Sequence, residues 1–573
     1  MESHWIILPK IDKSISKKLS NYPFLVRQIL FNRGIKSKNK AKNFLDKSFY
    51  EFYDPFKIYQ MKKAANLVLD YVEKGKKIYI HGDFDVDGIC ATSILFDFLY
   101  RELKANVMPY IPSRFNEGYG ISDESLGNIK KGGGELVITV DCGIRDNTLV
   151  KKWCKKGLDF IITDHHELKR DKKAGKVILP GEALAVVHPQ HPKGRYPFKD
   201  ISGATVVWKL IAAIAETKKI KLNIEEYLDL VGLSVVCDIM PLVDENRSML
   251  KKSFEAIKET KRVGLMRLIN DAGIDISRIN SYHLGFIIGP RLNAVGRLDH
   301  AIDAVRLLVT KSNNKARDLS EKLNLLNQRR QSIQREIYNK AVEQIKKAGI
   351  EKKLYFVWGE DWAEGVIGIV AGKISEKFHR PVLIATKCKG EYKGSARSIE
   401  RFNIIKAINL QSDILERFGG HPQAAGFTVK HENIEQFRDD LLEIADGELD
   451  EDDIRKEELV DCEIKINDVS FDLLEWVEKF APFGYGNKKP RFVIRDLEIS
   501  SVDLVGSDSS HLKFSFLNKD TGEFISAIGF RLGEKFPHLK AGDMIDILFT
   551  IELNEWNGSS TLQLNVTDLK VVE

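Results

Sequence analysis

The chain has 573 residues, of which 43% are hydrophobic and 30% charged, and its formal net charge is +6. This length exceeds that of a typical domain several-fold, so we expect several domains, each with its own core. The six cysteines show no CxxC spacing, which argues against a zinc ribbon or a disulfide framework, and no apolar run is long enough to cross a membrane. We therefore expect a folded, cytoplasmic, multidomain protein.

The positive charge is concentrated at the beginning of the chain. Residues 1–50 hold eleven Lys or Arg and three Asp or Glu, a net charge of +8, so the remaining residues sum to −2. This imbalance suits a polyanionic partner, although a solvated lysine-rich surface explains it equally well. We treat residues 1–50 as a basic N-terminal segment.

Three later stretches share one design, a short β-branched run with polar residues at its end. They are KKIYIHGDFDVDG (76–88), ELVITVDCGI (135–144) and LDFIITDHHE (158–167), and helical patterns separate them. Apolar strands that alternate with helices predict a parallel sheet covered on both faces. Ligands bind beyond the carboxyl ends of such strands, so the polar residues should meet in one crevice. They are Asp83, Asp85, Asp87, Asp141, Asp164, His165 and His166.

Carboxylates that converge in a dry crevice repel one another, and burying an unpaired charge is costly. No lysine is interleaved with these acids, so divalent cations are the expected counter-charges. Mixed Asp and His ligation without sulfur suits Mn²⁺, and it suits Mg²⁺ where carboxylates and water dominate. More carboxylates are present than one ion needs, which favours two metals that share a bridging Asp, an arrangement that activates water for attack at phosphorus.

The adjacent His165 and His166 raise a question of geometry. Neighbouring side chains on a strand point to opposite faces, so we expect the two imidazoles to serve different purposes. A lone His-His pair or Asp-x-Asp turn is more often part of a surface or a helix cap than of a metal site. Three acid-rich strand ends together favour the metal site.

Farther along, residues 314–348 contain no Pro or Gly and predict a long amphipathic helix. Residues 350–445 predict a second α/β unit, and the acidic segment 447–458 predicts a boundary. Five apolar stretches, from RFVIRDLEISSVDLVG (491–506) to TLQLNVTDLKVV (561–572), predict about five strands of an oligonucleotide-binding barrel. The predicted domains are 1–50 (basic segment), 51–300 (catalytic domain), 301–348 (connecting helix), 349–447 (substrate-binding domain) and 448–573 (barrel).

The chain resembles the DHH phosphoesterase superfamily, and within it the RecJ exonucleases, in an ordered series of motifs. These are HGDFDVDG (81–88), VDCGI (140–144), TDHHE (163–167), VCDIMPL (236–242) and GPRLNAVGR (289–297), followed by KGSARS (393–398) and FGGHPQAAGF (418–427). The resemblance covers nearly the whole chain. It implies an α/β fold in which a parallel-sheet DHH catalytic domain is joined by a long helix to a second α/β DHH-associated domain, followed by a C-terminal β-barrel (OB-fold).

The resemblance also implies roles for individual residues. His81 and Asp85 would hold one metal, and Asp141 would bridge it to a second. The second metal would be held by Asp87, His165 and Asp238. His166 would face the scissile phosphate as the donor of a hydrogen bond or a proton, with Asp83 and Asp164 orienting the groups around it. The implied substrate-binding residues are Arg114, Arg291, Asn293, Arg297, Ser395, Arg397, Gly420 and His421.

The implied activity is that of a single-strand-specific 5′-to-3′ DNA exonuclease. It would release 5′-mononucleotides with two divalent cations, Mn²⁺ or Mg²⁺, in DNA repair and recombination, with a helicase and a single-strand-binding protein as partners. Two alternatives are a phosphodiesterase for short oligoribonucleotides or cyclic dinucleotides and a non-catalytic scaffold. The basic segment and the barrel argue against the first alternative, and the intact set of predicted ligands argues against the second.

Overall fold

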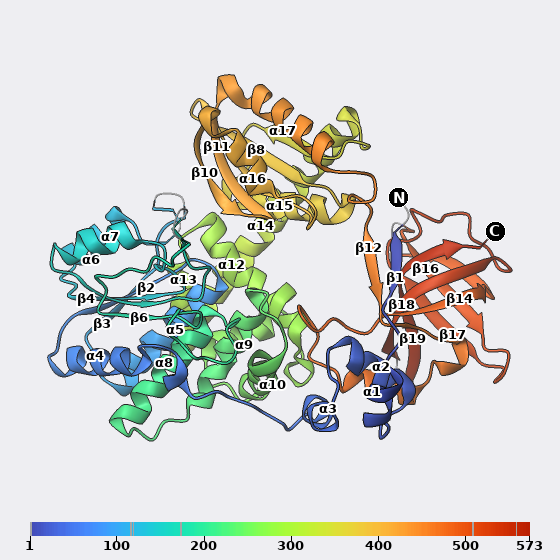
Figure 1. Ribbon diagram of the computed structural model, residues 1–573, viewed down its shortest axis with the longest axis horizontal. Coiled ribbons are helices and arrows are strands. Elements are labelled where there is room, and N and C mark those ends of the chain that lie inside the picture. Colours follow the sequence, from blue (N-terminus) through green and yellow to red (C-terminus); the bar gives the residue numbers. More distant parts are fainter. Residues whose placement is uncertain are drawn as a thin grey trace. The chain divides into compact units, whose positions relative to one another are not determined.

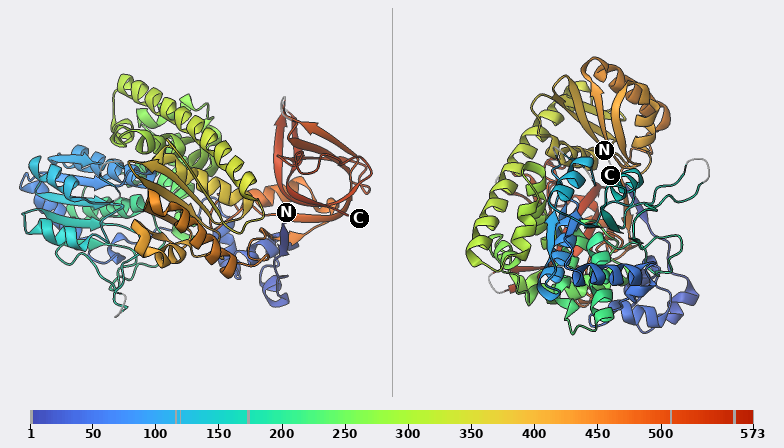
Figure 2. Two further views of the ribbon diagram at one scale, coloured as in Figure 1. Left: turned by 90° about the horizontal axis from the view of Figure 1, so that it is seen from above. Right: turned by 90° about the vertical axis from the view of Figure 1, so that its left-hand side faces the viewer.

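The computed structural model describes residues 3–114, 117–118, 120–171, 175–506, 509–556 and 559–572. The chain forms two compact units, one of residues Tyr50–Ile454 and one that combines Met1–Phe49 with Arg455–Glu573 (Figures 1 and 2). The basic N-terminal segment therefore shares a unit with the C-terminal residues. No helix in the described ranges has both the length and the apolar composition that a membrane span requires.

The first sheet of the unit 50–454 has five parallel strands in the order β3-β2-β4-β5-β6. Ile78 and Ile138 bury on one face of this sheet, in a core shared with helices α4, α5 and α8. Val137 and Phe160 bury on the other face, under α6 and α7. Both faces are covered, as predicted. The elements are α4 (Met61–Glu73), β2 (Ile78–Gly82), α5 (Val86–Asp97), β3 (Val107–Tyr110), α6 (Asp123–Lys131), β4 (Leu136–Val140), α7 (Asn147–Cys154), β5 (Asp159–Thr163), β6 (Ala185–Val187) and α8 (Gly203–Lys218).

One long helix, α14 (Asn313–Ala348), joins this domain to the next. Near its start it buries Leu323 in the core of the first sheet, and near its end it buries Ile337 and Ile345 in the core of the second. The predicted connecting helix is therefore confirmed. The helices that precede it are α9 (Leu228–Cys237), α10 (Asp244–Lys258), α11 (Val263–Asp271), α12 (Gly289–Leu298) and α13 (Ile302–Val309), with π-helical turns η2 (Phe98–Glu102) and η5 (His283–Ile288).

The second sheet is mixed, in the order β10-β11-β9-β8-β7, and only β7 and β8 run parallel. Helix α15 packs on one face through Val366 and Val370, and α16 and α17 pack on the other through Ile408 and Phe437. The elements are β7 (Tyr355–Gly359), α15 (Glu364–Phe378), β8 (Val382–Cys388), β9 (Glu391–Arg397), α16 (Ile404–Leu410), β10 (Leu415–His421), β11 (Ala424–Lys430) and α17 (Ile434–Glu448).

The other unit contains a curved sheet in the order β13-β14-β18-β19-β17-β16-β15 (Figure 2). The stretch 491–506, predicted as one strand, forms two, which corrects the expected count of about five. The ladder between β14 and β18 shifts register between Ile494 and Leu497, where Asp496 has a left-handed backbone (φ 52°), and it resumes as far as Glu498. The chain then turns, and β15 pairs with β16 instead. The strands are β13 (Cys462–Glu463), β14 (Phe492–Glu498), β15 (Ser501–Val505), β16 (His511–Leu517), β17 (Phe524–Gly529), β18 (Met544–Trp556) and β19 (Ser559–Val571), and α18 (Phe471–Glu478) precedes β14.

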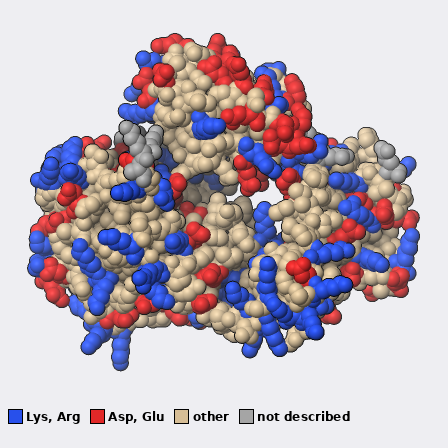
Figure 3. Space-filling view, in the orientation of Figure 1, with Lys and Arg blue, Asp and Glu red and all other residues tan. Residues whose placement is uncertain are grey.

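The N-terminal segment packs on this sheet. Strand β1 (His4–Ile7) pairs in parallel with β12 (Glu457–Val460). Val26 and Ile29 are buried with the residues of the barrel core. Lys38, Lys40 and Lys42 are exposed, and Figure 3 shows Lys and Arg side chains gathered over α1 and α3. The helices are α1 (Lys13–Lys18), α2 (Phe24–Asn32) and α3 (Lys38–Leu45).

A buried ion pair anchors helix α8 to the start of α10. The Lys209 ammonium contacts the Glu245 carboxylate and donates to the carbonyl oxygen of Tyr53 at 2.5 Å. Glu245 also accepts a hydrogen bond from the Tyr53 N–H at 2.8 Å and one from the Tyr196 hydroxyl. Burial lowers the pKa of Lys209, so the charge depends on these partners. The pair fixes α8, whose N-terminus lies at the candidate site.

We predict that Lys209→Met destabilises the fold by about 3–5 kcal/mol, because it leaves the Glu245 carboxylate buried without a counter-charge. Scanning calorimetry should show a lower unfolding temperature for this variant. Lys218→Met, at an exposed position of the same helix, is the matched control and should leave that temperature unchanged. Equal unfolding temperatures for the two variants would contradict the anchoring role of the pair.

Candidate metal centre and phosphate site

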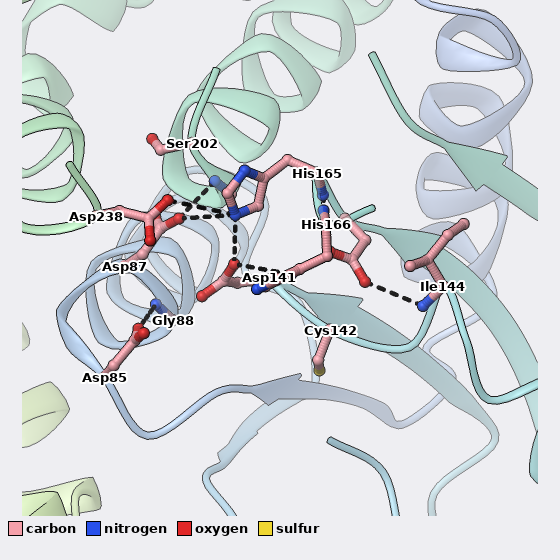
Figure 4. A network of polar contacts seen from close by, with 12 residues as sticks. Asp85, Asp87, Gly88, Asp141, Cys142, Ile144, His165, His166, Ser202 and Asp238 are labelled. Atoms are coloured by element: carbon pink, nitrogen blue, oxygen red, sulfur yellow. Dashed lines mark hydrogen bonds and ion pairs between the residues drawn. The ribbon is translucent and has the colours of Figure 1, made fainter. Parts of the chain in front are cut away.

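The central strands β2 and β4 are neighbours, but the chain continues from them to opposite sides of the sheet, to β3 in one direction and to β5 and β6 in the other. Such a switch point opens a crevice beyond the carboxyl ends of the strands. Eight predicted site residues lie around it, together with the C-terminal end of α9 (Figure 4). They are Asp83, Asp85, Asp87, Asp141, Asp164, His165, His166 and Asp238.

A tight turn between β2 and α5 positions the first three aspartates. Asp85 caps α5, since its Oδ1 accepts a hydrogen bond from the Gly88 N–H at 3.0 Å. A Cβ on Gly88 would lie 2.4 Å from the carbonyl oxygen of Asp83, so only glycine fits this turn. Asp87 falls in the first turn of the helix, where the helix dipole favours negative charge.

Groups far away in the sequence hold Asp87. The N–H groups of Gly203 and Ala204, in the first turn of α8, donate to its two oxygens at 2.6 and 2.7 Å, and the Ser234 hydroxyl donates at 2.6 Å. A Cβ on Gly203 would lie 2.7 Å from the Cβ of Asp141, so α8 approaches both carboxylates closely. Sequence reasoning missed these residues. The only local signal for them in the sequence is a serine placed before an apolar helix, because serine is a common N-cap.

His165 lies at the centre of the crevice. Its Nε2 is 3.1 Å from Asp141 Oδ1 and 3.5 Å from both Asp87 Oδ2 and Asp238 Oδ2. The possible ligand atoms fall into overlapping groups, each within 4.8 Å. These groups are Asp87, His165 and Asp238; Asp83, Asp85 and Asp141; and Asp141, His165 and His166.

Unsatisfied atoms mark this crevice as a cation site. In the described part of the chain, four buried atoms here have no hydrogen-bond partner, namely Asp83 Oδ1, Asp141 Oδ1, His165 Nε2 and Asp238 Oδ2. Buried polar atoms are nearly always paired, and divalent cations would satisfy all four. Carboxylate oxygens and imidazole nitrogen without a thiolate form a donor set that fits Mn²⁺ or Mg²⁺.

The electrostatics agree with this assignment. Burial, reinforced by neighbouring carboxylates, raises the pKa of Asp83, Asp85, Asp141 and Asp238 above the ordinary aspartate value. Burial lowers the pKa of His165. Exclusion of water disfavours the charged form of every one of these groups, and it outweighs the attraction of the carboxylates for a protonated His165. Among the aspartates, little positive charge opposes the gathered negative charge. Bound cations would reverse that balance.

The two histidines do not diverge, so strand alternation does not apply to them, and their expected difference in purpose stays a prediction. Strand β5 ends at Thr163, and the chain has left strand geometry before the pair begins. The two imidazole rings lie 4.6 Å apart, and both approach Asp141 Oδ1, with His165 Nε2 at 3.1 Å and His166 Nδ1 at 3.7 Å. The rings nevertheless have different partners.

Asp164 organises the loop that carries them. Its Oδ1 accepts hydrogen bonds from the N–H groups of His165 (2.7 Å) and His166 (3.0 Å) and from His166 Nδ1 (2.8 Å), and its Oδ2 accepts one from the Ile144 N–H (3.0 Å). Burial opposes charge on Asp164 and His166, but their hydrogen bond and mutual attraction prevail. The pKa of Asp164 is therefore well below its usual range, and the pKa of His166 is raised to about 9.

His188, which sequence reasoning missed, supports the same loop. It follows β6 directly, at the same sheet edge as the predicted residues. Its Nδ1 accepts a hydrogen bond from the Gln190 N–H at 3.0 Å, so its Nε2 donates to the carbonyl oxygen of His166 at 2.8 Å. Burial lowers the pKa of His188 to about 4, which keeps the ring neutral. Its position directly after a buried strand is the sequence feature that could have identified it as a site residue.

His81 lies apart from the donor groups. It is fully buried, with Nε2 3.2 Å from Ser125 Oγ and Nδ1 3.7 Å from Cys142 Sγ, and its ring stacks on Tyr110 at 5.5 Å. Burial lowers the pKa of His81 to about 4. Asp83 completes the group beside Asp85 and Asp141. A ligand role for His81 stays a prediction.

Four of the predicted substrate-binding residues converge. The Arg114 guanidinium lies 3.8 Å from the centre of the Phe84 ring, and its Nε donates to the carbonyl oxygen of Gly296 at 3.1 Å. Arg397 Nη1 donates to Ser395 Oγ at 3.1 Å. Burial, and then the positive charges of Arg114, Arg330 and Arg397, lower the pKa of Arg297 to about 10. These guanidinium groups thus form a cationic pocket suited to an anion.

Two glycines of α15, also missed from the sequence, allow this convergence. A Cβ on Gly368 would lie 2.9 Å from Ser395 Oγ and 3.3 Å from Arg397 Nη2. A Cβ on Gly365 would lie 2.4 Å from the carbonyl oxygen of Arg297, and the Gly365 carbonyl accepts from Arg297 Nη1 at 3.0 Å. The helix can pack beneath the pocket only because these side chains are absent.

The other predicted binding residues lie around this pocket. Arg291 is held by Asn324 Oδ1 (2.8 Å) and the carbonyl of Ile287 (2.6 Å), about 9 Å along α12 from Arg297. Asn293 is partly buried, one helical turn before Arg297. A Cβ on Gly420 would lie 2.3 Å from the carbonyl oxygen of Ala424, in the β10–β11 hairpin. His421 is half exposed, and its Nδ1 lies 3.4 Å from Glu167 Oε2.

Three family models match the chain. They are described as the DHH family, N-terminal domain (residues 77–235), the DHHA1 domain (residues 351–447) and the RecJ OB domain (residues 460–568). These matches confirm the predicted fold class, with a DHH domain, a DHH-associated domain and a C-terminal OB domain.

Curated relatives match over nearly the full length. The chain is 36% identical to the single-stranded-DNA-specific exonuclease RecJ of Bacillus subtilis (strain 168), over 98% of this chain and 70% of that protein. It is 30% identical to the single-stranded-DNA-specific exonuclease RecJ of Haemophilus influenzae, over 98% of both.

Solved structures agree. RecJ from Thermus thermophilus in complex with Mn²⁺ matches with a TM-score of 0.84 and 26% identity, over 100% of this chain and 80% of that one. The complex of that protein with Mg²⁺ matches with a TM-score of 0.79 and 25% identity, over 100% and 79%. Sequence, domain order and fold all agree, so the chain belongs to the RecJ family of DHH-type exonucleases.

Proposed function

We propose that this chain is a single-strand-specific 5′-to-3′ DNA exonuclease that uses two divalent cations, Mn²⁺ or Mg²⁺, and releases 5′-mononucleotides. The observation that carries the proposal is the pair of buried donor groups at the β2–β4 switch point, one formed around His165 and one around Asp85, with Asp141 within reach of both. Relatives named single-stranded-DNA-specific exonucleases, and the Mn²⁺ and Mg²⁺ complexes of one of them, support the substrate class and the metals.

The chain's own residues keep this centre in a fixed geometry. Asp87 is held by two backbone N–H groups of α8 and by Ser234, so it needs no reorganisation when a ligand binds. When bound, two cations activate water and neutralise charge on a phosphodiester. Asp87, His165 and Asp238 would hold one cation, and Asp83 and Asp85 the other, with His81 as its further predicted ligand. Asp141 would be shared by both.

His166 would act on the phosphodiester rather than on a metal. Its Nδ1–H is bound to Asp164, which fixes the orientation of the ring from one side, while His188 fixes the backbone carbonyl from the other. A second N–H at Nε2 can then donate a hydrogen bond or a proton to the phosphate or to the leaving oxygen.

The arginine pocket supports attack at a strand end. Arg114, Arg297 and Arg397, with the Ser395 hydroxyl, offer more donors than an internal phosphodiester can use, whereas a terminal phosphate has three acceptor oxygens. We propose that this pocket receives the 5′-terminal phosphate, with Arg291, Asn293, Gly420 and His421 contacting the substrate around it. Such an anchor explains release of one nucleotide at a time.

The wider role belongs to the same proposal. The resemblance to RecJ exonucleases supports DNA repair and recombination in the cytoplasm, with single-stranded DNA, a helicase and a single-strand-binding protein as partners. In the part of the chain that the structure describes, the cysteines are free and no helix spans a membrane.

Asp141→Ala should reduce mononucleotide release by at least about 100-fold, because it removes the carboxylate shared by both donor groups. Release is measured in Mn²⁺ on strands of increasing length labelled at either end, and on duplexes. Asp275→Ala, an exposed aspartate of the same unit, is the control and should match wild type. Lack of release by the wild-type chain in both Mn²⁺ and Mg²⁺ would refute the nuclease proposal, and a preference for dinucleotides would favour a small-substrate phosphodiesterase.

His166→Ala should lower the turnover number by about 10²- to 10⁴-fold while leaving Mn²⁺ binding intact, since the ring is proposed to act on the phosphate. Isothermal titration calorimetry gives the number of Mn²⁺ ions bound, and single-turnover kinetics gives the rate. His165→Ala is the matched comparison and should lose Mn²⁺ affinity. Loss of one Mn²⁺ from His166→Ala would contradict this division between the two histidines.

Arg397→Ala should raise KM for a 5′-phosphorylated strand by about 10- to 100-fold, because a charge-assisted hydrogen bond to the phosphate is lost. It should also abolish any preference for a 5′-phosphate over a 5′-hydroxyl, measured as the ratio of kcat/KM on paired substrates. Arg401→Ala, an exposed arginine nearby in sequence, serves as the control. An unchanged ratio in Arg397→Ala would remove the terminal phosphate from this pocket.

A further inference from the structure

The residue that follows Asp238 is unusual for the turn in which it lies. Helix α9 ends at Cys237, and the Ile239 N–H donates to the carbonyl of Val236 (3.2 Å) while the Met240 N–H donates to that of Val235 (3.0 Å). This is the hydrogen-bond pattern of a Schellman motif, whose left-handed position normally holds glycine. Here it holds Ile239, with φ 55°. A β-branched residue is strained in this conformation.

Burial does not explain the isoleucine. The Ile239 side chain is 66% exposed, so it contributes little to the core, and glycine would suit the backbone better. A strained, exposed apolar side chain directly after a proposed metal ligand points to a contact made by that side chain outside the protein.

An exposed aromatic pair lies on the element beside this turn. Tyr282 directly precedes η5 and Phe286 lies in its middle, and these side chains are 60% and 73% exposed. Their rings stack with centroids 5.3 Å apart and planes 25° apart. The two rings present a joint apolar surface to solvent instead of joining the core.

Close contacts hold η5 against the last turn of α9. A Cβ on Gly285 would lie 3.1 Å from Val236 Cγ1, and a Cβ on Gly289 would lie 2.4 Å from Cys237 Sγ. The Cys237 thiol donates to the carbonyl of Leu284 at 3.6 Å. The aromatic pair is therefore carried by the segment that packs against the residues just before Asp238.

We propose that Ile239, Tyr282 and Phe286 form a contact surface for the bases of the DNA strand, next to the metal centre. This inference rests on the proposed nuclease function and assigns the residues that touch the bases, as opposed to the phosphates. Aromatic side chains stack on any nucleobase, which suits an enzyme without sequence preference.

Position and charge favour a nucleic acid strand over a partner protein. The surface adjoins the turn of Asp238, so a strand whose phosphate reaches that residue brings neighbouring bases past it. Arg291 is fixed to the end of η5 through the Ile287 carbonyl and forms no ion pair with the described residues. A stacked aromatic pair beside a guanidinium group matches the alternation of bases and phosphates along a single strand.

Two substrates test the base contact. One is a natural oligothymidylate, and the other has the same backbone with abasic tetrahydrofuran units after the first nucleotides. The double variant Tyr282→Ala/Phe286→Ala should lose roughly 5- to 100-fold in kcat/KM on the natural strand, mainly through KM. The abasic strand should be a correspondingly poorer substrate for wild type, and on it the double variant and wild type should differ little.

Controls separate this inference from the nuclease proposal. Tyr100→Ala removes another exposed aromatic side chain of the same unit and should match wild type. Tyr100 stacks on Phe96 beyond the far end of α5, and that end lies about 18 Å along the helix from Asp85. Mn²⁺-dependent hydrolysis of bis(p-nitrophenyl) phosphate, which has no base, should be the same in the double variant and wild type. Fluorescence anisotropy with both strands tests the contact even if wild type releases no nucleotide.

Ile239→Gly provides a second test, because a structural and a functional role predict different results. Glycine suits the left-handed turn, so the unfolding temperature should not fall, while KM for the natural strand should rise. Equal kinetics and binding of the double variant and wild type on natural strands would overturn the inference. Equal losses on natural and abasic strands would also overturn it, and would assign the surface to something other than bases.

Discussion

Electrostatic repulsion among buried carboxylates is the constraint on which the rest of this structure depends. Five aspartates from three separate segments meet at the β2–β4 switch point, where burial and mutual repulsion raise the pKa of most of them. The fold holds them there with fixed dipoles, namely the N-termini of α5 and α8 and the hydroxyl of Ser234. What the fold leaves uncompensated is charge that divalent cations can balance. The five are Asp83, Asp85, Asp87, Asp141 and Asp238.

The adjacent histidines show how one loop places two side chains in the same crevice. His165 and His166 are adjacent and both face the crevice, yet their partners differ. His165 approaches three carboxylates, whereas His166 is bound to Asp164, which in turn is held by backbone N–H groups. One short loop therefore places two adjacent imidazoles in different electrostatic environments. The arginine pocket around Arg297 lies in the same unit and gathers positive charge.

Local patterns in the sequence predicted much of this. The apolar strands with acids at their ends placed Asp83, Asp87 and Asp141 in one crevice, because parallel strands share a carboxyl edge. Contacts between distant segments could not be predicted from local sequence patterns. Gly203 and Ser234 hold Asp87 across more than 100 residues, and the N-terminal β1 pairs with β12 from the other end of the chain. His81 fits the motif, yet its ring has other partners, since burial beside Ser125 and Cys142 depends on packing.

Anomalous diffraction at the manganese absorption edge, from crystals of the full chain grown with Mn²⁺, tests the central claim most directly. We expect two anomalous peaks in the crevice, one contacting Asp87, His165 and Asp238 and the other contacting Asp83 and Asp85, with Asp141 between them. A single peak, or peaks that do not share Asp141, would contradict the proposed two-cation centre.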